Sequence, residues 1–135
     1  MNLLIIDGQG GGLGKQLISA VKAQDSSIVI TAVGTNALAT GAMLKAGADF
    51  AATGENAAIV GCRNADVIAG PIGIVVADSL LGEITPKIAV AVGQSRAKRV
   101  LIPLNNHCDN LIAGVADSNL AHLCADAAKK ILELK

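Results

Sequence analysis

Aromatic side chains are almost absent from this chain of 135 residues, which contains one phenylalanine and neither tyrosine nor tryptophan. A hydrophobic core must therefore be built from alanine, valine, isoleucine and leucine. Hydrophobic residues make up 52% of the chain and charged residues only 16%. A small domain with so few charges is expected to hide some apolar surface in contacts between subunits.

An excess of charge of one sign is also missing. Eleven basic residues balance eleven acidic ones. The densest basic cluster, Arg96, Lys98 and Arg99, is smaller than the basic footprint that nucleic-acid binding usually needs. We therefore expect no nucleic-acid partner. A net charge near zero also does little to keep copies of the chain apart.

Neither paired cysteines nor a long apolar run is present. Cys62, Cys108 and Cys124 lie far apart, and their odd number indicates neither a disulfide framework nor a zinc site. The apolar runs are shorter than the ~20 residues that span a bilayer, and the first residues lack the basic segment of a signal peptide. These absences predict a cytoplasmic protein with reduced thiols, no metal and no membrane partner.

Short apolar runs alternate with segments of helical periodicity along the chain. Strands are expected at residues 3–6, 28–33, 49–52, 66–70, 100–104 and 111–115. Between them, Asn36 and Pro86 mark the starts of helices, and Asp117 or Ser118 is expected to cap the last one. This order predicts a single α/β domain over residues 1–135. Its three layers are a mostly parallel sheet of five or six strands and helices on both faces.

The segment 72–81 is apolar almost all round. A helix there would be hydrophobic on every side and would need a partner to bury it. Together with the helix that follows, this segment gives a predicted contact surface of a homo-oligomer at residues 72–92. One hypothesis for the function is therefore a non-enzymatic structural or regulatory domain that associates with itself.

Glycines crowd the junction between the first strand and the first helix, which reads IDGQGGGLGK over residues 6–15. A turn without Cβ atoms lets the backbone approach a phosphate closely, and the following helix points its free N–H groups at the anion. The junction therefore predicts nucleotide binding, with a merely tight turn as the alternative. Asp7 is expected to accept backbone N–H bonds that shape the turn, because a carboxylate would repel a phosphate.

The spacing of the glycines favours a dinucleotide such as NAD or NADP. The pattern G-x-G-x-x-G fails because Leu13 stands at its last glycine. The related G-x-x-x-G-x-G fits at Gly8, Gly12 and Gly14 and is similar to the cofactor turn of short-chain dehydrogenases. The chain has no tyrosine, however, and those enzymes transfer protons with a tyrosine beside a lysine. Catalysis of their kind is therefore excluded, whereas recognition of the phosphates is not.

A P-loop for ATP fits less completely. Its end matches at Gly14 and Lys15, whereas Gln9 and Gln16 stand where the pattern needs a glycine and a serine or threonine. The residues that would handle phosphate and metal are thus missing. A P-loop-like ATP binder remains a further alternative.

Ligands of such sheets bind outside the carboxyl ends of the strands, where three more segments fall. Thr35 and Asn36 have the groups to hydrogen-bond a ribose or a 2′-phosphate, or to cap the next helix; no acid or arginine there selects NAD or NADP. The segment 70–73 is expected either to line the cofactor with its backbone or only to introduce a kink in the chain. His107 and Cys108 are candidates for a general base and a nucleophile. The predicted cofactor-binding residues are Gly8, Gln9, Gly10, Gly11, Gly12, Leu13, Gly14, Thr35, Asn36, Gly70, Pro71 and Ile72.

An ordered set of motifs covers essentially the whole chain. It comprises segments 6–14, 34–36, 46–56 with its Thr-Gly-Glu-Asn, 70–73, 81–86 and 93–95. Together they resemble the bacterial domain of unknown function 3842 family. The resemblance implies a small bacterial protein with a Rossmann-like fold, and it implies no particular activity.

Overall fold

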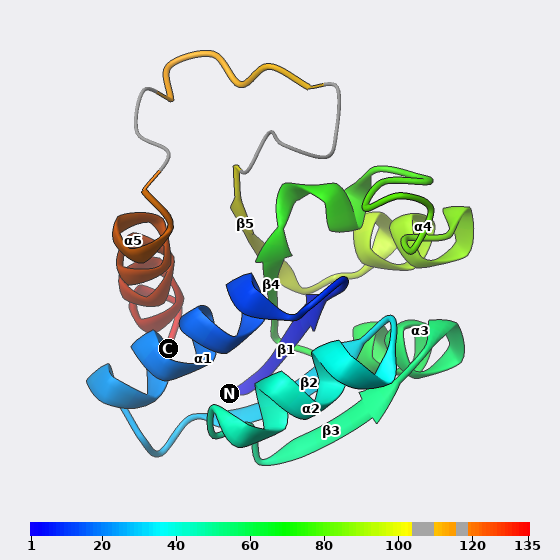
Figure 1. Cartoon of the computed structure of the whole chain (residues 1–135). Helices are drawn as coiled ribbons and strands as arrows, with labels where there is room; N and C mark the ends of the chain where they lie inside the picture. The colour runs from blue at the N-terminus through cyan, green and yellow to red at the C-terminus, as the bar shows by residue number, and fades with distance from the viewer. Residues whose placement is uncertain (104–109, 116–118) are drawn as a thin grey trace.

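The computed structural model describes residues 1–103, 110–115 and 119–135. Strands and helices alternate as expected, and Figure 1 shows the strands between two layers of helices. The elements are β1 (Asn2–Asp7), α1 (Gly12–Gln24), β2 (Val29–Gly34), α2 (Ala37–Lys45), β3 (Phe50–Thr53), α3 (Glu55–Asn64), β4 (Val67–Pro71), the 3₁₀ helix η1 (Ile72–Val75), α4 (Pro86–Gln94), β5 (Lys98–Ile102) and α5 (Leu120–Glu133). The α/β class with helices on both faces is therefore confirmed.

The five strands form one parallel sheet in the order β3-β2-β1-β4-β5. The central strand β1 pairs with β2 on one side, where Ile6 lies opposite Val33, and with β4 on the other, where Ile5 lies opposite Ala69. The chain thus builds outward from β1 in one direction and then returns to build in the other. This Rossmann-like order leaves the loops after β1 and β4 on either side of a crevice, where ligands of such sheets bind.

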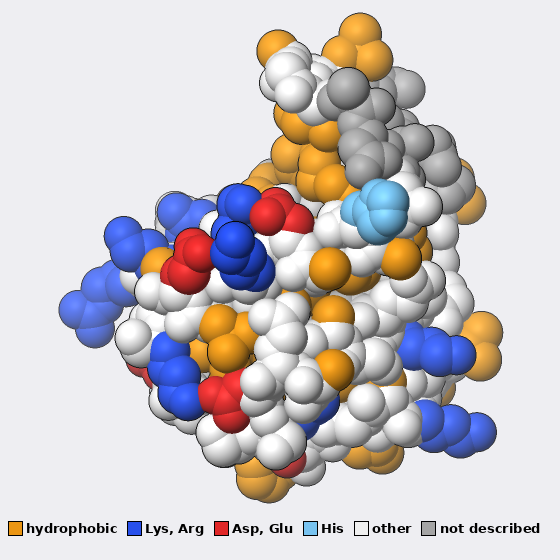
Figure 2. Space-filling model, turned by 90° about the vertical axis from the view of Figure 1, so that its left-hand side faces the viewer, with side chains coloured by type: hydrophobic (Ala, Val, Ile, Leu, Met, Phe, Trp, Pro, Cys, Tyr) orange, Lys and Arg blue, Asp and Glu red, His pale blue; other side chains and the backbone are white. Residues whose placement is uncertain are grey.

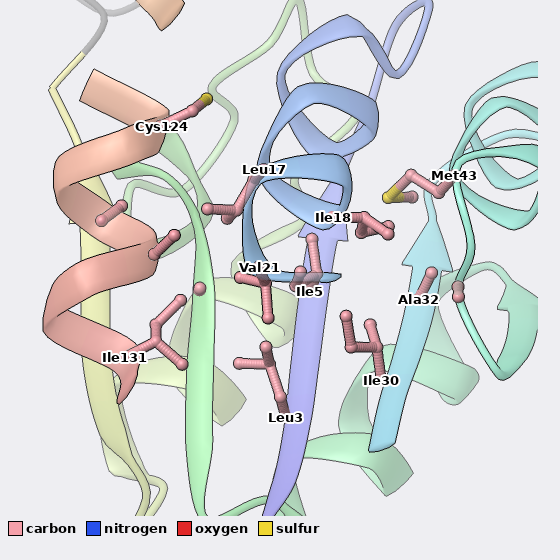
Figure 3. Packing of buried hydrophobic residues seen from close by; sticks show 14 of the residues in the cluster. Leu3, Ile5, Leu17, Ile18, Val21, Ile30, Ala32, Met43, Cys124 and Ile131 are labelled. Carbon is pink, nitrogen blue, oxygen red and sulfur yellow. The ribbon is translucent and has the colours of Figure 1, made fainter. Parts of the chain in front are cut away.

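Alternate side chains of β1 enter two aliphatic cores. Leu3 and Ile5 pack with residues of α1, α2 and α5, and Figure 3 shows this core from close by. Leu4 and Ile6 point to the opposite face and pack with residues of α3 and α4. The single aromatic residue, Phe50, is 63% exposed and belongs to neither core. The scarcity of aromatics therefore leaves both cores to aliphatic packing, as expected.

An ion pair fastens the first crossover to the sheet. The Lys22 ammonium in the last turn of α1 lies 2.9 Å from an Asp49 carboxylate oxygen and donates to the Ile28 carbonyl at 2.7 Å. The same Asp49 oxygen accepts the Ile30 N–H at 2.8 Å.

On the molecular face seen in Figure 2, basic side chains are interspersed with acidic ones. Among the described residues, no helix is both long and apolar enough to cross a membrane.

The expected helix over residues 72–81 is wrong. The chain makes only the short η1 and then turns through Asp78, Leu80 and Leu81, with φ values of 66°, 54° and 57°. Ile74 and Leu80 enter the core on the α3–α4 face. The segment therefore buries part of its apolar surface by folding back against the chain itself.

The expected sixth strand is also wrong, because none of the described residues 110–115 lies in a strand. Leu111 is 94% exposed and Gly114 has a φ of 81°, so this short apolar run makes a turn at the surface. The cap of the last helix is Asn119, whose side chain accepts the His122 N–H at 3.0 Å, rather than Asp117 or Ser118. Those two residues lie outside the described residues.

Candidate functional site

The glycine turn joins the carboxyl end of β1 to the first residue of α1. The Gly11 N–H donates to the Gly8 carbonyl at 2.9 Å, and Gly11 has a φ of 74°. A Cβ at Gly11 would lie 2.8 Å from the Ala39 Cα, and one at Gly8 would lie 2.7 Å from the Thr35 hydroxyl. These two buried glycines therefore let the turn pack against α2 and the end of β2.

The absence of a side chain at Gly14 also has a structural reason. It is buried in the first turn of α1, and a Cβ there would lie 2.5 Å from the Met43 sulfur and 3.0 Å from the Asp7 Cβ. Without a side chain, α1 comes close to both α2 and the end of β1. The tight-turn interpretation thus accounts for part of the motif.

Gly10 and Gly12 are different, because both are exposed. A Cβ built on either would meet no atom within 4 Å among the described residues, and neither glycine has a positive φ. Their backbone N–H groups donate to no acceptor in the described part of the chain. Neither packing nor backbone conformation therefore explains why these two positions lack a side chain.

Asp7 closes the turn from inside. Its two carboxylate oxygens accept the N–H of Gly8 at 2.8 Å and that of Gly14 at 2.7 Å, and the residue is only 5% exposed. Burial raises the pKa of this carboxyl, although the two hydrogen bonds oppose that effect. The expectation that Asp7 shapes the turn is confirmed.

Sequence reasoning missed Glu83. This residue lies in the loop of residues 76–85, which connects η1 to α4, and its carboxylate reaches the glycine turn. Oε1 accepts the Gln9 N–H at 3.0 Å, the Thr35 hydroxyl at 2.6 Å and the Asn36 side-chain amide at 2.7 Å. Burial opposes ionisation, but these hydrogen bonds outweigh it and hold the pKa of Glu83 below its ordinary value. No local pattern reveals this contact, since Glu83 stands far from Thr35 in the sequence.

Asn36 takes the capping role, one of the two that the sequence left open, and its contact with a ribose or phosphate stays a prediction. Its Oδ1 accepts the Ala39 N–H at 2.9 Å and caps α2. Its Nδ2 donates to the Gln9 carbonyl at 2.9 Å as well as to Glu83. The end of β2, the glycine turn and the loop of residues 76–85 are thereby joined in one hydrogen-bonded network.

The end of β4 contributes mainly to the sheet. Gly70 and Pro71 are buried, and a Cβ at Gly70 would collide with the Ile6 carbonyl oxygen. The glycine at this position therefore allows β4 to approach β1. Ile72 is partly exposed at the start of η1. A cofactor contact for these three residues stays a prediction.

The two described cysteines do not have the properties of a nucleophile. Cys62 and Cys124 are buried free thiols, and burial raises the pKa of each to about 11. His107 and Cys108 lie outside the described residues, so their catalytic roles stay predictions. In the described part of the chain, no group of three or more His, Cys, Asp or Glu residues is arranged to hold a metal ion.

This fold, with a glycine turn after its central strand, defines a Rossmann-like α/β protein. The chain belongs to the domain of unknown function family DUF3842, whose sequence model matches residues 2–135. Among solved structures, it is similar to a dodecameric FMN-dependent UbiX-like decarboxylase from Escherichia coli. The two are 20% identical, with 97% of this chain and 76% of that chain covered and a TM-score of 0.47. No curated protein matches the sequence significantly.

Proposed function

We propose that this protein binds a nucleotide, of the NAD or NADP type, at the carboxyl edge of its sheet. The observation that carries this proposal is the pair Gly10 and Gly12, which are exposed and which no packing or backbone constraint requires to be glycine. A missing side chain above free backbone N–H groups serves the close approach of a phosphate. The same two positions open toward solvent at the start of α1, where the helix dipole favours an anion.

The neighbouring carboxylates limit where phosphates can sit. Asp7 already accepts the Gly14 N–H, and Glu83 accepts the Gln9 N–H. In the described part of the chain, the N–H groups of Gly10 and Gly12 donate to no acceptor and are available to a phosphate. Thr35 and Asn36 lie on the β2 side of this position, where the rest of a nucleotide would extend.

The proposal is tested by calorimetry with NAD, NADP, FAD, ATP and S-adenosylmethionine. We expect a nucleotide to bind to the unaltered chain and to bind more weakly to the Gly10→Ala and Gly12→Ala variants. The control is Gly93→Ala in α4, because a Cβ there also meets no described atom within 4 Å but lies outside the turn. Absence of binding by every one of these compounds would refute the proposal.

We propose self-association through residues 72–92 as a second function of this chain. It is supported by Leu81, which is 86% exposed, and by Val90, which is 53% exposed. Light scattering on the unaltered chain is expected to give a mass above that of one chain, and Leu81→Ser is expected to lower it. Leu38→Ser is the control, because Leu38 is 72% exposed in α2, outside this region. A monomer at micromolar concentration would contradict this proposal.

A further inference from the structure

We propose that Glu83 determines which nucleotide the glycine turn accepts, by taking hydrogen bonds from the hydroxyls of an adenosine ribose and by rejecting a phosphate on that ribose. The site would therefore select NAD over NADP, a choice that the end of β2 alone does not make. This inference rests on the proposed function and adds the class of ligand to it.

The two oxygens of the Glu83 carboxylate are used unequally. Oε1 accepts from Gln9, Thr35 and Asn36, whereas Oε2 accepts only the Gln9 N–H, at 3.1 Å, among the described residues. An ionised carboxylate has about four acceptor positions, so Oε2 retains unused ones. One oxygen is thus held in place by the protein, and the other is available to a ligand that donates.

The position of this carboxylate matches the chemistry of a ribose site. Dinucleotide-binding sheets place an acid beside the end of the second strand, where it accepts from the ribose 2′-hydroxyl. Here β2 ends at Gly34 and is followed by Thr35 and Asn36, neither of which is acidic. Glu83 brings a carboxylate to both of those residues from a loop that follows η1.

The loop of residues 76–85 is built to hold Glu83 there. Its ends are joined by the Asp78 N–H, which donates to the Ile84 carbonyl at 2.7 Å. Leu80 is buried against the turn, with its Cδ1 3.1 Å from where a Cβ of Gly8 would lie. The Ser79 hydroxyl donates to the Gly73 carbonyl and fastens the loop to η1. The carboxylate is therefore fixed before any ligand arrives.

A phosphate on the ribose would meet this carboxylate without compensation. The donors to Glu83 among the described residues are all neutral, and no described Lys or Arg side chain pairs with it. Like charges placed together strongly disfavour a wrong partner. We therefore expect the dissociation constant for NADP to exceed that for NAD by at least about tenfold.

The experiment measures the dissociation constants of NAD and NADP by calorimetry for the unaltered chain, for Glu83→Gln and for Glu133→Gln. Glu83→Gln keeps the shape of the side chain but removes its charge. This variant is expected to lower the ratio of the NADP dissociation constant to the NAD dissociation constant from about tenfold or more to within about twofold. Glu133→Gln removes the same charge from the end of α5 and should leave the ratio unchanged.

A second measurement needs no variant and covers the case in which Glu83→Gln fails to fold. ADP and 2′-deoxy-ADP are titrated into the unaltered chain. Removal of the hydroxyl is expected to weaken binding by about tenfold or more, because a site built to receive a hydroxyl rejects an analogue that lacks it. Equal affinity for the two compounds would overturn the role of Glu83.

The outcomes separate the two proposals. If neither dinucleotide nor ADP binds to the unaltered chain, this inference is refuted; if FAD, ATP and S-adenosylmethionine do not bind either, the proposed function is refuted with it. If NAD and NADP bind equally, or if Glu83→Gln leaves their ratio unchanged, only the inference is refuted. If Glu83→Gln strengthens the binding of both by the same factor, Glu83 competes with phosphate and does not select the ribose, which also overturns the inference.

Discussion

The glycines of the turn should separate into two groups when each is replaced by alanine. Gly11→Ala places a Cβ 2.8 Å from the Ala39 Cα, at a residue with a φ of 74°. The left-handed conformation costs about 1–2 kcal/mol for a residue with a Cβ, and overpacking adds about 1–3 kcal/mol. Gly14→Ala places a Cβ 2.5 Å from the sulfur of the buried Met43 and 3.0 Å from the Asp7 Cβ. Gly14 has no positive φ, so only overpacking of about 1–3 kcal/mol applies.

The exposed pair should behave in the opposite way. Gly12 is the first residue of α1, and neither Gly10 nor Gly12 has a positive φ. An alanine that fits the native backbone stabilises a protein by about 0.4–1 kcal/mol, chiefly by restricting the unfolded chain. Binding of a nucleotide should nevertheless weaken about tenfold or more, the equivalent of one lost hydrogen bond to a charged group.

The assay is urea denaturation followed by far-ultraviolet circular dichroism, because the chain has no tryptophan whose fluorescence could report unfolding. The free energies of unfolding of the four single variants are compared at neutral pH, and nucleotide titrations follow on those that fold. A loss of stability in Gly12→Ala as large as that in Gly11→Ala would refute the division into structural and ligand-facing glycines. Full nucleotide affinity in both Gly10→Ala and Gly12→Ala would refute the functional half alone.

Three further predictions concern ionisable groups. The Lys22 ammonium and the Ile30 N–H hold the pKa of the Asp49 carboxyl below its ordinary value of 3.8. The contribution of Asp49 to stability is therefore present above pH 3.8 and is lost as the pH falls. Asp49→Asn should flatten the acid side of a plot of unfolding free energy against pH. Burial raises the pKa of Asp7, so the contribution of this carboxyl to stability is largest at low pH and declines as the pH rises above 3.8. The unfolding free energy of Asp7→Asn should therefore rise relative to that of the unaltered chain over that range. A difference between the two that does not change with pH would contradict this. In a Cys108→Ser background, Cys62 and Cys124 should react with a thiol reagent only after denaturation, because both are buried with a pKa of about 11; rapid reaction of the native protein would show that burial does not protect them.

Local patterns were sufficient for most of the architecture. Helical periodicity after the glycine-rich junction predicted α1, and Asn36 and Pro86 predicted the starts of α2 and α4. These features depend on residues within one or two turns of each other, which is why they can be recognised without the fold. The order of strands and helices then required a parallel sheet with helices on both faces.

The two wrong elements failed for a common physical reason. Residues 72–81 and 111–115 are apolar runs, and an apolar run specifies burial but not the partner that provides it. In the first segment, Ile74 and Leu80 reach the domain's own core by means of turns. In the second, Leu111 stays exposed and no strand forms.

The sequence alone determined that a glycine-rich turn follows the first strand, and that its spacing is closer to a dinucleotide site than to a P-loop. Only the tertiary structure decided which glycines serve packing, because Gly11 and Gly12 differ in what lies around the position of a missing Cβ. It also brought Glu83 to Thr35, a contact between distant segments that strand order and loop packing create. Local spacing in the sequence does not predict chemistry that depends on such contacts, because the residues meet only in the folded sheet.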